Sequence, residues 1–249
     1  MTKVLLEICC GSIDDAIGAA QGGADRVELC SALFLGGLTP SIGTIQEAKA
    51  RLAIPVMAMV RPRSGGFCYT EAEMATMERD VDAALAAGAD GIVFGILAPD
   101  GAIDVARSAR LRERIGNRQA VFHRAFDVTP DPFVALEQLV DLGITRVLTS
   151  GQRPTVPEGL PLIAKLLERA GDRIEILPGG GIEPWNFQHV VAASGCKQVH
   201  LTAWGAAAID PSCRANPAVT FGGALYPPED RYQVTDPALV RQLVGALGR

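Results

Sequence analysis

The sequence lacks several features that would place it in a common functional class. It has no C-x-x-C pair and no Walker-type phosphate loop, and no apolar run reaches the length of a transmembrane helix. Its first residues run into a strand-like segment, without an apolar stretch of signal-peptide length or a small-residue cleavage site. We therefore expect a cytoplasmic protein with no membrane partner, in which the six cysteines are reduced thiols.

Positive charge is also scarce. The net charge is -5 at pH 7 over 249 residues, which argues against nucleic acid or an anionic membrane surface as the main partner. A small molecule, an ion or another protein remains. No linker or change in composition divides the chain, so we predict a single domain over residues 1–249.

One phrase recurs along the chain and marks the junction between a helix and the next strand. It reads GGADRV at 22–27, AGADGI at 87–92, LGITRV at 142–147 and SGCKQV at 194–199. In each copy a glycine can end the helix with positive φ, and the residues after it turn the chain into an apolar run. The copies start roughly 50 to 65 residues apart, about two strand-helix units, so a unit without the phrase is expected between each pair.

Strand-like runs are expected at about 4–9, 26–30, 55–61, 91–97, 119–126, 145–150, 173–178 and 197–203, with helical periodicity between nearly all of them. Helix starts are indicated by Thr70 with Glu73, by Asp131 before a proline, by Pro184, and by Asp236 before a proline. Eight alternating units favour an α/β fold of the (β/α)8 TIM-barrel type over an open doubly wound sheet. A long irregular segment, about 205–235, precedes the last helix; segments of that length are usually lids, oligomer contacts or mobile loops.

Polar residues gather where the predicted strands end, which is where TIM barrels carry their active sites. The candidate pocket residues are Glu7, Glu28, Arg61, Arg63, His123 and Asp127, and further polar strand ends are Arg124, His200 and Thr202. The two arginines could hold an anionic group, or could merely neutralise the two glutamates as a buried ionic layer. His123 and Asp127 could act as general acid and base, provided that Asp127 reaches in from the loop after the strand.

A second group of residues predicts an anion site. It comprises Ser150 at the end of the sixth strand and the turn Gly179, Gly180 and Gly181 after the seventh, where barrels often bind phosphate. The alternative is a tight turn that needs glycine and binds nothing.

Two thiols suggest a metal site. A side-chain period of two places Glu7 with Cys9 on one face of the first strand and Glu28 with Cys30 on one face of the second. If Glu7 lies opposite Glu28, the two thiols lie at the same depth. Two thiolates with few other ligands suit Cu(I) better than Mg²⁺ or Ca²⁺, whereas tetrahedral zinc would need two more ligands. No organic cofactor is predicted.

Several motifs together resemble the CutC copper homeostasis family, over nearly the whole chain. They are Leu6-Glu7-Ile8-Cys9, the run 23–30 from Gly23 to Cys30, Gly36-Gly37-Leu38-Thr39-Pro40-Ser41, Val60-Arg61-Pro62-Arg63, Phe122-His123-Arg124-Ala125-Phe126-Asp127, Arg146-Val147-Leu148-Thr149-Ser150-Gly151 and Pro178-Gly179-Gly180-Gly181-Ile182. The chain departs from the family's pattern at one place, after the eighth strand. Many family members have a sequence similar to Ser-Ala-Arg there, whereas this chain has Thr202-Ala203-Trp204.

The resemblance implies a TIM barrel, a cytosolic location, self-association as a dimer or tetramer, and a role in copper tolerance, with Cys9 and Cys30 as Cu(I) ligands. Two hypotheses follow. The protein binds or transports copper without turnover, or it is a metabolic enzyme that acts on a small anionic compound bearing phosphate or carboxylate. The first leaves the charged strand ends without a role.

Overall fold

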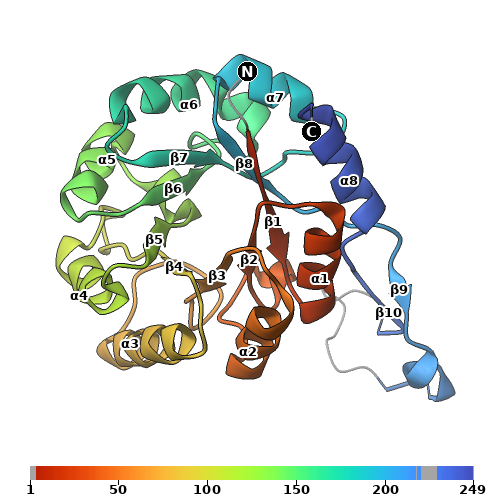
Figure 1. Cartoon of the computed structure of the whole chain (residues 1–249). Coiled ribbons are helices and arrows are strands. Elements are labelled where there is room, and N and C mark those ends of the chain that lie inside the picture. The colour runs from red at the N-terminus through yellow and green to blue at the C-terminus, as the bar shows by residue number, and fades with distance from the viewer. Residues whose placement is uncertain (1–3, 217, 220–228, 249) are drawn as a thin grey trace.

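The computed structural model describes residues 4–216, 218–219 and 229–248. Its centre is a ring of parallel strands (Figure 1): β1 (Leu5–Cys10), β2 (Arg26–Leu29), β3 (Val56–Met59), β4 (Gly91–Phe94), β5 (Gln119–Phe122), β6 (Arg146–Thr149), β7 (Glu175–Pro178) and β8 (Gln198–Leu201). The hydrogen-bonded order is β7-β6-β5-β4-β3-β2-β1-β8, and a parallel bridge between Gly179 and His200 joins the two ends of that order. The predicted (β/α)8 barrel is confirmed.

Helices surround this ring (Figure 1): α1 (Ile13–Gly22), α2 (Ile42–Arg51), α3 (Glu71–Ala86), α4 (Val105–Ile115), α5 (Pro132–Asp141), α6 (Val156–Ala170) and α7 (Phe187–Ser194), with α8 (Pro237–Ala246) beside α1. Two 3-10 turns, η1 (Leu33–Leu35) and η2 (Arg124–Val128), follow β2 and β5. Thr70 and Glu73 form the predicted capping box of α3. Asp131 and Asp236 cap α5 and α8 as predicted.

The start of α7 was predicted too early. Pro184 lies in a turn, and the helix begins three residues later at Phe187. The side chain of Asn186 holds this turn, because its Oδ1 accepts the backbone N–H of Glu183 and its Nδ2 donates to the carbonyl oxygen of Gly181, both at 2.9 Å. These bonds compete locally with helix formation.

The recurring phrase ends a helix with a glycine of positive φ in every copy, as the sequence predicted. Its second residue has a positive φ in all four copies, for example 92° at Gly23 and 99° at Gly88. The acidic residue of the phrase has a role that was not predicted. Asp25 accepts the backbone N–H of Leu6, and Asp90 accepts that of Val56, each at 2.8 Å. In these two copies the phrase therefore also ties the new strand to the neighbouring one.

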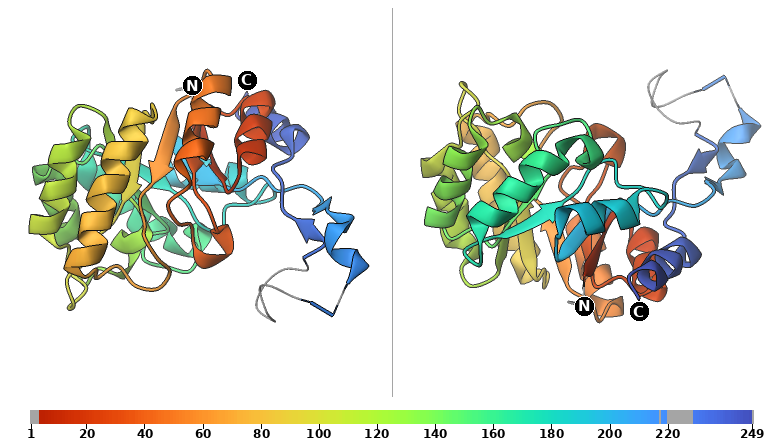
Figure 2. Two further views of the ribbon diagram at one scale, coloured as in Figure 1. Left: turned by 90° about the horizontal axis from the view of Figure 1, so that it is seen from below. Right: turned by 90° about the horizontal axis from the view of Figure 1, so that it is seen from above.

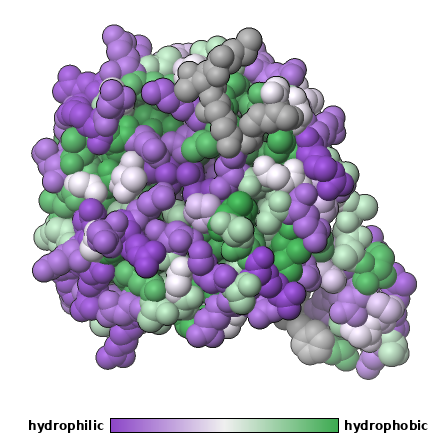
Figure 3. Space-filling view, viewed as in Figure 1, coloured by the Kyte–Doolittle hydropathy of each residue, from purple (hydrophilic) through white to green (hydrophobic). Residues whose placement is uncertain are grey.

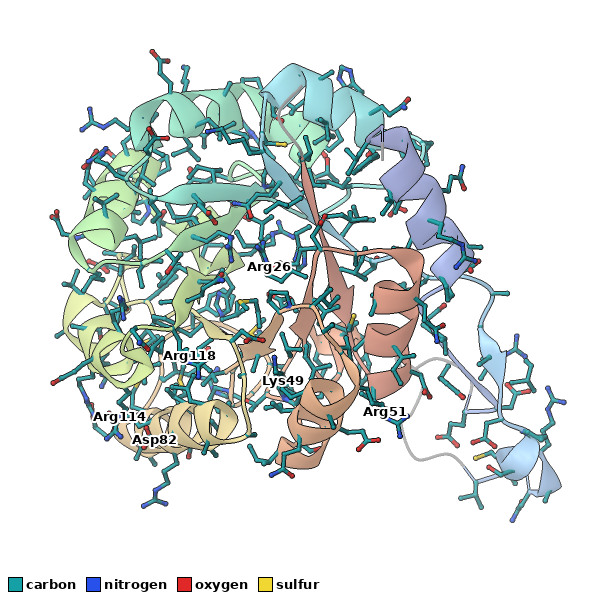
Figure 4. The ribbon with its side chains drawn as sticks, viewed as in Figure 1. Arg26, Lys49, Arg51, Asp82, Arg114 and Arg118 are labelled. Carbon is teal, nitrogen blue, oxygen red and sulfur yellow. The ribbon has the colours of Figure 1, made fainter. Side chains whose placement is uncertain are left out.

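Side chains that point into the barrel form two layers. The lower layer is polar and comes largely from residues that begin a strand: Arg26, Gln119, Arg146, Glu175 and Gln198, together with Glu7. Figure 4 shows Arg26 inside the ring of strands. Above it lies a small apolar cluster of Cys9, Cys30, Met57, Met59, Val93 and Val121. The polar layer thus fills the lower part of the barrel, and the apolar cluster lies towards the carboxyl ends of its strands.

Described residues of the segment 205–235 form an arm that projects away from the barrel (Figures 1 and 2). Within it, β9 (Ala208–Ile209) pairs antiparallel with β10 (Arg231–Tyr232), and η3 (Pro211–Ala215) lies between them in sequence. Arg214 pairs with Asp230 inside the arm, at 2.7 Å. Three prolines of this segment, Pro217, Pro227 and Pro228, lie outside the described residues.

The surface seen in Figure 3 mixes hydrophilic and hydrophobic residues. Within residues 4–216, 218–219 and 229–248, none of the helices combines the length and the apolar composition that a transmembrane segment requires.

Candidate functional site

A pocket of about 440 Å³ lies at the carboxyl ends of the strands. Its walls include six of the predicted site residues, Cys9, Glu28, Cys30, Arg61, His123 and Asp127. Arg124, His200 and Trp204 also line it; the first two were noted as polar strand ends but were not among the predicted site residues. Glu7 and Arg63 do not line it. No described residue of the arm beyond Gly205 does either.

The register between β1 and β2 does not meet the condition under which the two thiols would lie at the same depth. Glu7 lies opposite Arg26, and Cys9 lies opposite Glu28, so Glu7 is not opposite Glu28. Neighbouring strands of a barrel are staggered, so residues at equivalent positions in two strands do not share a level. The stagger puts the carboxylate of Glu28 beside both thiols: its Oε2 is 3.4 Å from the sulfur of Cys9 and 3.5 Å from that of Cys30.

The two thiols differ in their affinity for protons. The hydrogen bond with Cys30 is the largest influence on Cys9 and, with the contact to His200, lowers the pKa of Cys9 to about 5 in spite of its burial. The same contact between the thiols, reinforced by burial, raises the pKa of Cys30 well above its usual range. Near neutral pH, Cys9 is therefore a thiolate that shares the proton of Cys30.

His200 links this pair to the polar layer below. Its Nδ1 lies 2.7 Å from Glu7 Oε1, and its Nε2 lies 3.7 Å from Glu28 Oε2. Burial lowers its pKa, but the neighbouring carboxyl groups of Glu28 and Glu7 and the thiol of Cys9 outweigh burial and raise the pKa well above the usual value. His200 is thus a buried imidazolium beneath the thiols.

The two buried glutamates carry different charges. Burial raises the pKa of both, but at Glu7 the guanidinium of Arg26 and the contact with His200 outweigh it and hold the pKa far below its usual value. At Glu28 burial prevails and raises the pKa to about 8, because His200 is opposed by the charges of Cys9 and Glu7. Glu7 is therefore a carboxylate and Glu28 a neutral acid near pH 7.

The suggestion that the arginines after β3 neutralise the glutamates is wrong. Arg61 donates to the carbonyl oxygens of Leu35, Gly37 and Gly65 at 2.7 to 3.1 Å. Arg63 turns outward, where it pairs with Glu73 at 2.5 Å and lies over the ring of Tyr69. The ionic layer exists, but arginines that begin strands, Arg26 and Arg146, supply its positive charge.

His123 and Asp127 do not pair. The strand ends at Phe122, and the following turn η2 carries Asp127 towards β6, where it accepts hydrogen bonds from Thr149 and from the backbone of Ser150. His123 instead accepts the backbone N–H of Ala125 at its Nδ1, at 3.1 Å. The two side chains line the same pocket as separate groups.

The predicted anion site lies beside Arg124. This arginine donates to Asp127 and to the hydroxyl of Ser150, both at 2.7 Å. Its guanidinium also stands against the turn at Gly180, where φ is 111° and a Cβ atom would lie 2.8 Å from Nη1. Gly179 pairs with β8, and Gly181 accepts from Asn186. Anion binding by Ser150, Gly179, Gly180 and Gly181 stays a prediction.

Comparisons with known proteins agree on the family. A profile described as the CutC family matches residues 4–205. A CutC family protein of Treponema denticola is 51% identical over 234 residues, covering 94% of this chain and 95% of the relative. The human protein named copper homeostasis protein cutC homolog is 44% identical over 239 residues, covering 96% and 87%.

Solved structures agree on the fold. A copper homeostasis protein CutC of Streptococcus agalactiae superposes with a TM-score of 0.77 at 38% identity, covering 80% of this chain and 98% of that one. N-(5'-phosphoribosyl)anthranilate isomerase of Pyrococcus furiosus reaches a TM-score of 0.56 at 14% identity, covering 98% of both chains. The second likeness shows the barrel alone.

Proposed function

The chain belongs to the CutC family, and on this premise we propose that it is a cytoplasmic copper homeostasis protein that binds Cu(I) through the thiols of Cys9 and Cys30. The self-association and the cytoplasmic location that the family resemblance implies belong to the same proposal.

One observation carries the proposal. The ligand atoms of Cys9, Glu28 and Cys30 all lie within 4.8 Å of one another, and all three residues are buried. Two soft sulfurs that converge from adjacent strands suit Cu(I), which binds thiolates strongly and accepts a low coordination number. A hard cation such as Mg²⁺ would require more oxygen ligands than the single carboxyl group of Glu28.

The charges of the site also suit a monovalent soft cation. Cys9 is already a thiolate, so binding of Cu(I) displaces the proton that Cys30 shares with it. His200 lies directly below and keeps its own positive charge paired with Glu7. The negative charge of a bis-thiolate copper site would therefore lie next to a buried imidazolium, which stabilises it.

A Cu(I) titration against a strong competing chelator tests the proposal. We expect Cys9→Ser and Cys30→Ser each to weaken Cu(I) binding about a hundredfold or more, since even outer partners of metal ligands contribute about 10- to 100-fold to affinity. Cys68→Ser is the matched control, because Cys68 is an exposed free thiol outside the pocket. Unchanged affinity in a double Cys9→Ser, Cys30→Ser variant would rule out the thiolate site.

A further inference from the structure

We propose that the same pocket holds a second ligand, a small organic carboxylate, whose oxygens accept hydrogen bonds from Arg61 and His123. This site goes beyond copper binding, because an arginine such as Arg61 is not a usual metal ligand and His123 belongs to neither group of described residues that could hold a metal ion.

The first observation is a pair of hydrogen-bond donors without acceptors. Among the residues that the structure describes, Nε of Arg61 and Nε2 of His123 are both buried and have no partner. The side chains themselves are buried, with 6% and 4% of each residue exposed, and both line the pocket. Buried polar groups are nearly always hydrogen-bonded, and leaving a donor unpaired is unfavourable.

The charge of Arg61 is the second observation. Its Nη atoms are fixed by three backbone carbonyls, of Leu35, Gly37 and Gly65. In the described part of the chain it forms no salt bridge, whereas the other buried arginines, Arg26 and Arg146, each bind a carboxylate. A buried cation without a counter-ion is unfavourable unless a ligand supplies the negative charge.

His123 presents a donor rather than a second cation. Because its Nδ1 accepts the backbone N–H of Ala125, the proton of the neutral ring lies on Nε2. Burial, with the nearby charge of Arg61, lowers its pKa to about 3, so the ring stays neutral. Arg61 and His123 together therefore offer one positive charge and two N–H groups.

Phe67 brings the two donors into one environment. Its ring centroid lies 5.2 Å from Cζ of Arg61 and 4.9 Å from the ring centroid of His123. An aromatic wall over both groups excludes water, and hydrogen bonds to a charged acceptor are stronger in such surroundings.

The donor set fits a carboxylate better than a phosphate. A carboxylate has two oxygens and one negative charge, which match two N–H groups and one unpaired guanidinium. A phosphate group has a larger charge and at least three oxygens to satisfy. Arg124, the other arginine of the pocket, is already paired with Asp127 at 2.7 Å. The volume of about 440 Å³ admits a metabolite of modest size.

Nuclear magnetic resonance of the histidine rings tests this site with acetate as the probe, on the full chain kept reduced and free of copper. The chain has three histidines, so their ring signals can be assigned by substitution. We expect millimolar acetate to shift the ring resonances of His123 in a saturable way and to leave those of the exposed His189 unchanged. Acetamide, which has the same shape without the charge, is expected to have no effect.

Two variants separate this site from the copper site. Arg61→Lys keeps the charge but loses the Nε donor, and we expect it to weaken acetate binding about tenfold or more while leaving the affinity for Cu(I) unchanged. Arg63→Lys, on the neighbouring outward-facing arginine, should leave acetate binding unchanged. The proposal is overturned if acetate fails to shift His123, if phosphate binds there more tightly than acetate, or if Arg61→Lys binds acetate as the natural chain does.

Discussion

Glu7→Gln removes one buried charge and changes the shape of the side chain little. Glu7 is about 3% exposed at its side chain, accepts a hydrogen bond from Arg26, and lies 2.7 Å from His200. Glutamine would leave Arg26 with Gln198 as its partner, at 2.9 Å, and would leave His200 without a full counter-charge. Breaking a buried ion pair from one side costs about 3–5 kcal/mol, because the remaining charge stays buried and unpaired.

For a chain of this length, about 1 kcal/mol corresponds to a shift of about 2–4 °C in Tm. We therefore expect Glu7→Gln to lower Tm by about 6–20 °C at pH 7, measured by scanning calorimetry, with urea denaturation as a second measurement.

Glu47→Gln is the matched control. It makes the same chemical change in an ion pair with Arg51 whose side chains are 47% and 58% exposed. A helical pair of that kind contributes only about 0.3–0.5 kcal/mol. If Glu7→Gln lowers Tm no more than Glu47→Gln does, the buried network does not stabilise the barrel and the reasoning is refuted.

The pH dependence gives an independent check. The pKa of Glu7 is lower in the folded chain than its ordinary value of 4.5, because Arg26 and His200 outweigh the effect of burial. Its stabilisation is therefore present above pH 4.5 and is lost as the pH falls towards the folded-state pKa. The difference in unfolding free energy between the natural chain and Glu7→Gln should narrow in acid. A difference that stays constant down to pH 3 would contradict this.

Two further predictions use the same structure. Gly159→Ala in α6 should destabilise the protein by about 1–3 kcal/mol, because the added Cβ would lie 1.8 Å from the carbonyl oxygen of Ser150. Gly245→Ala in α8 is the control, because its Cβ would meet no atom within 4 Å. This control should stabilise the protein by about 0.5–1 kcal/mol. A loss of stability in both variants alike would contradict this. Cu(I) binding at pH 7 should release about one proton, since Cys9 is already ionised and Cys30 is not. Calorimetry in buffers of different ionisation enthalpy measures this release, and a value of about two protons would refute the expectation.

The barrel and its helix ends could be predicted because their signals are local. A glycine with positive φ, an N-cap such as Asp131 and a run of apolar residues act within a few positions of the chain. The start of α7 was predicted wrongly, although the signal that sets it is also local. The side chain of Asn186 holds a turn where Pro184 indicated a helix.

The candidate pocket could be predicted in outline, because a barrel gathers its strand ends at one face. Choosing among the polar strand ends was harder. His200 is a single histidine in a short strand. Nothing near it in the sequence indicates that it lies between Glu7 and the thiols. The closure of the barrel brings β8 beside β1, and this contact spans 193 residues.

By itself the sequence determined which side chains share a face of each strand, since that depends only on the alternation of the extended backbone. It placed Cys9 with Glu7, and Cys30 with Glu28, inside the barrel. Only the tertiary structure decided the levels at which they meet. The stagger between β1 and β2 places Glu28 beside the thiols and Arg26 beside Glu7. Hydrogen bonds to loop carbonyls hold Arg61 in the pocket. The ion pair with Glu73 holds Arg63 outside it. Register and loop contacts join residues that are far apart in the chain, so their outcome depends on the closed fold as a whole.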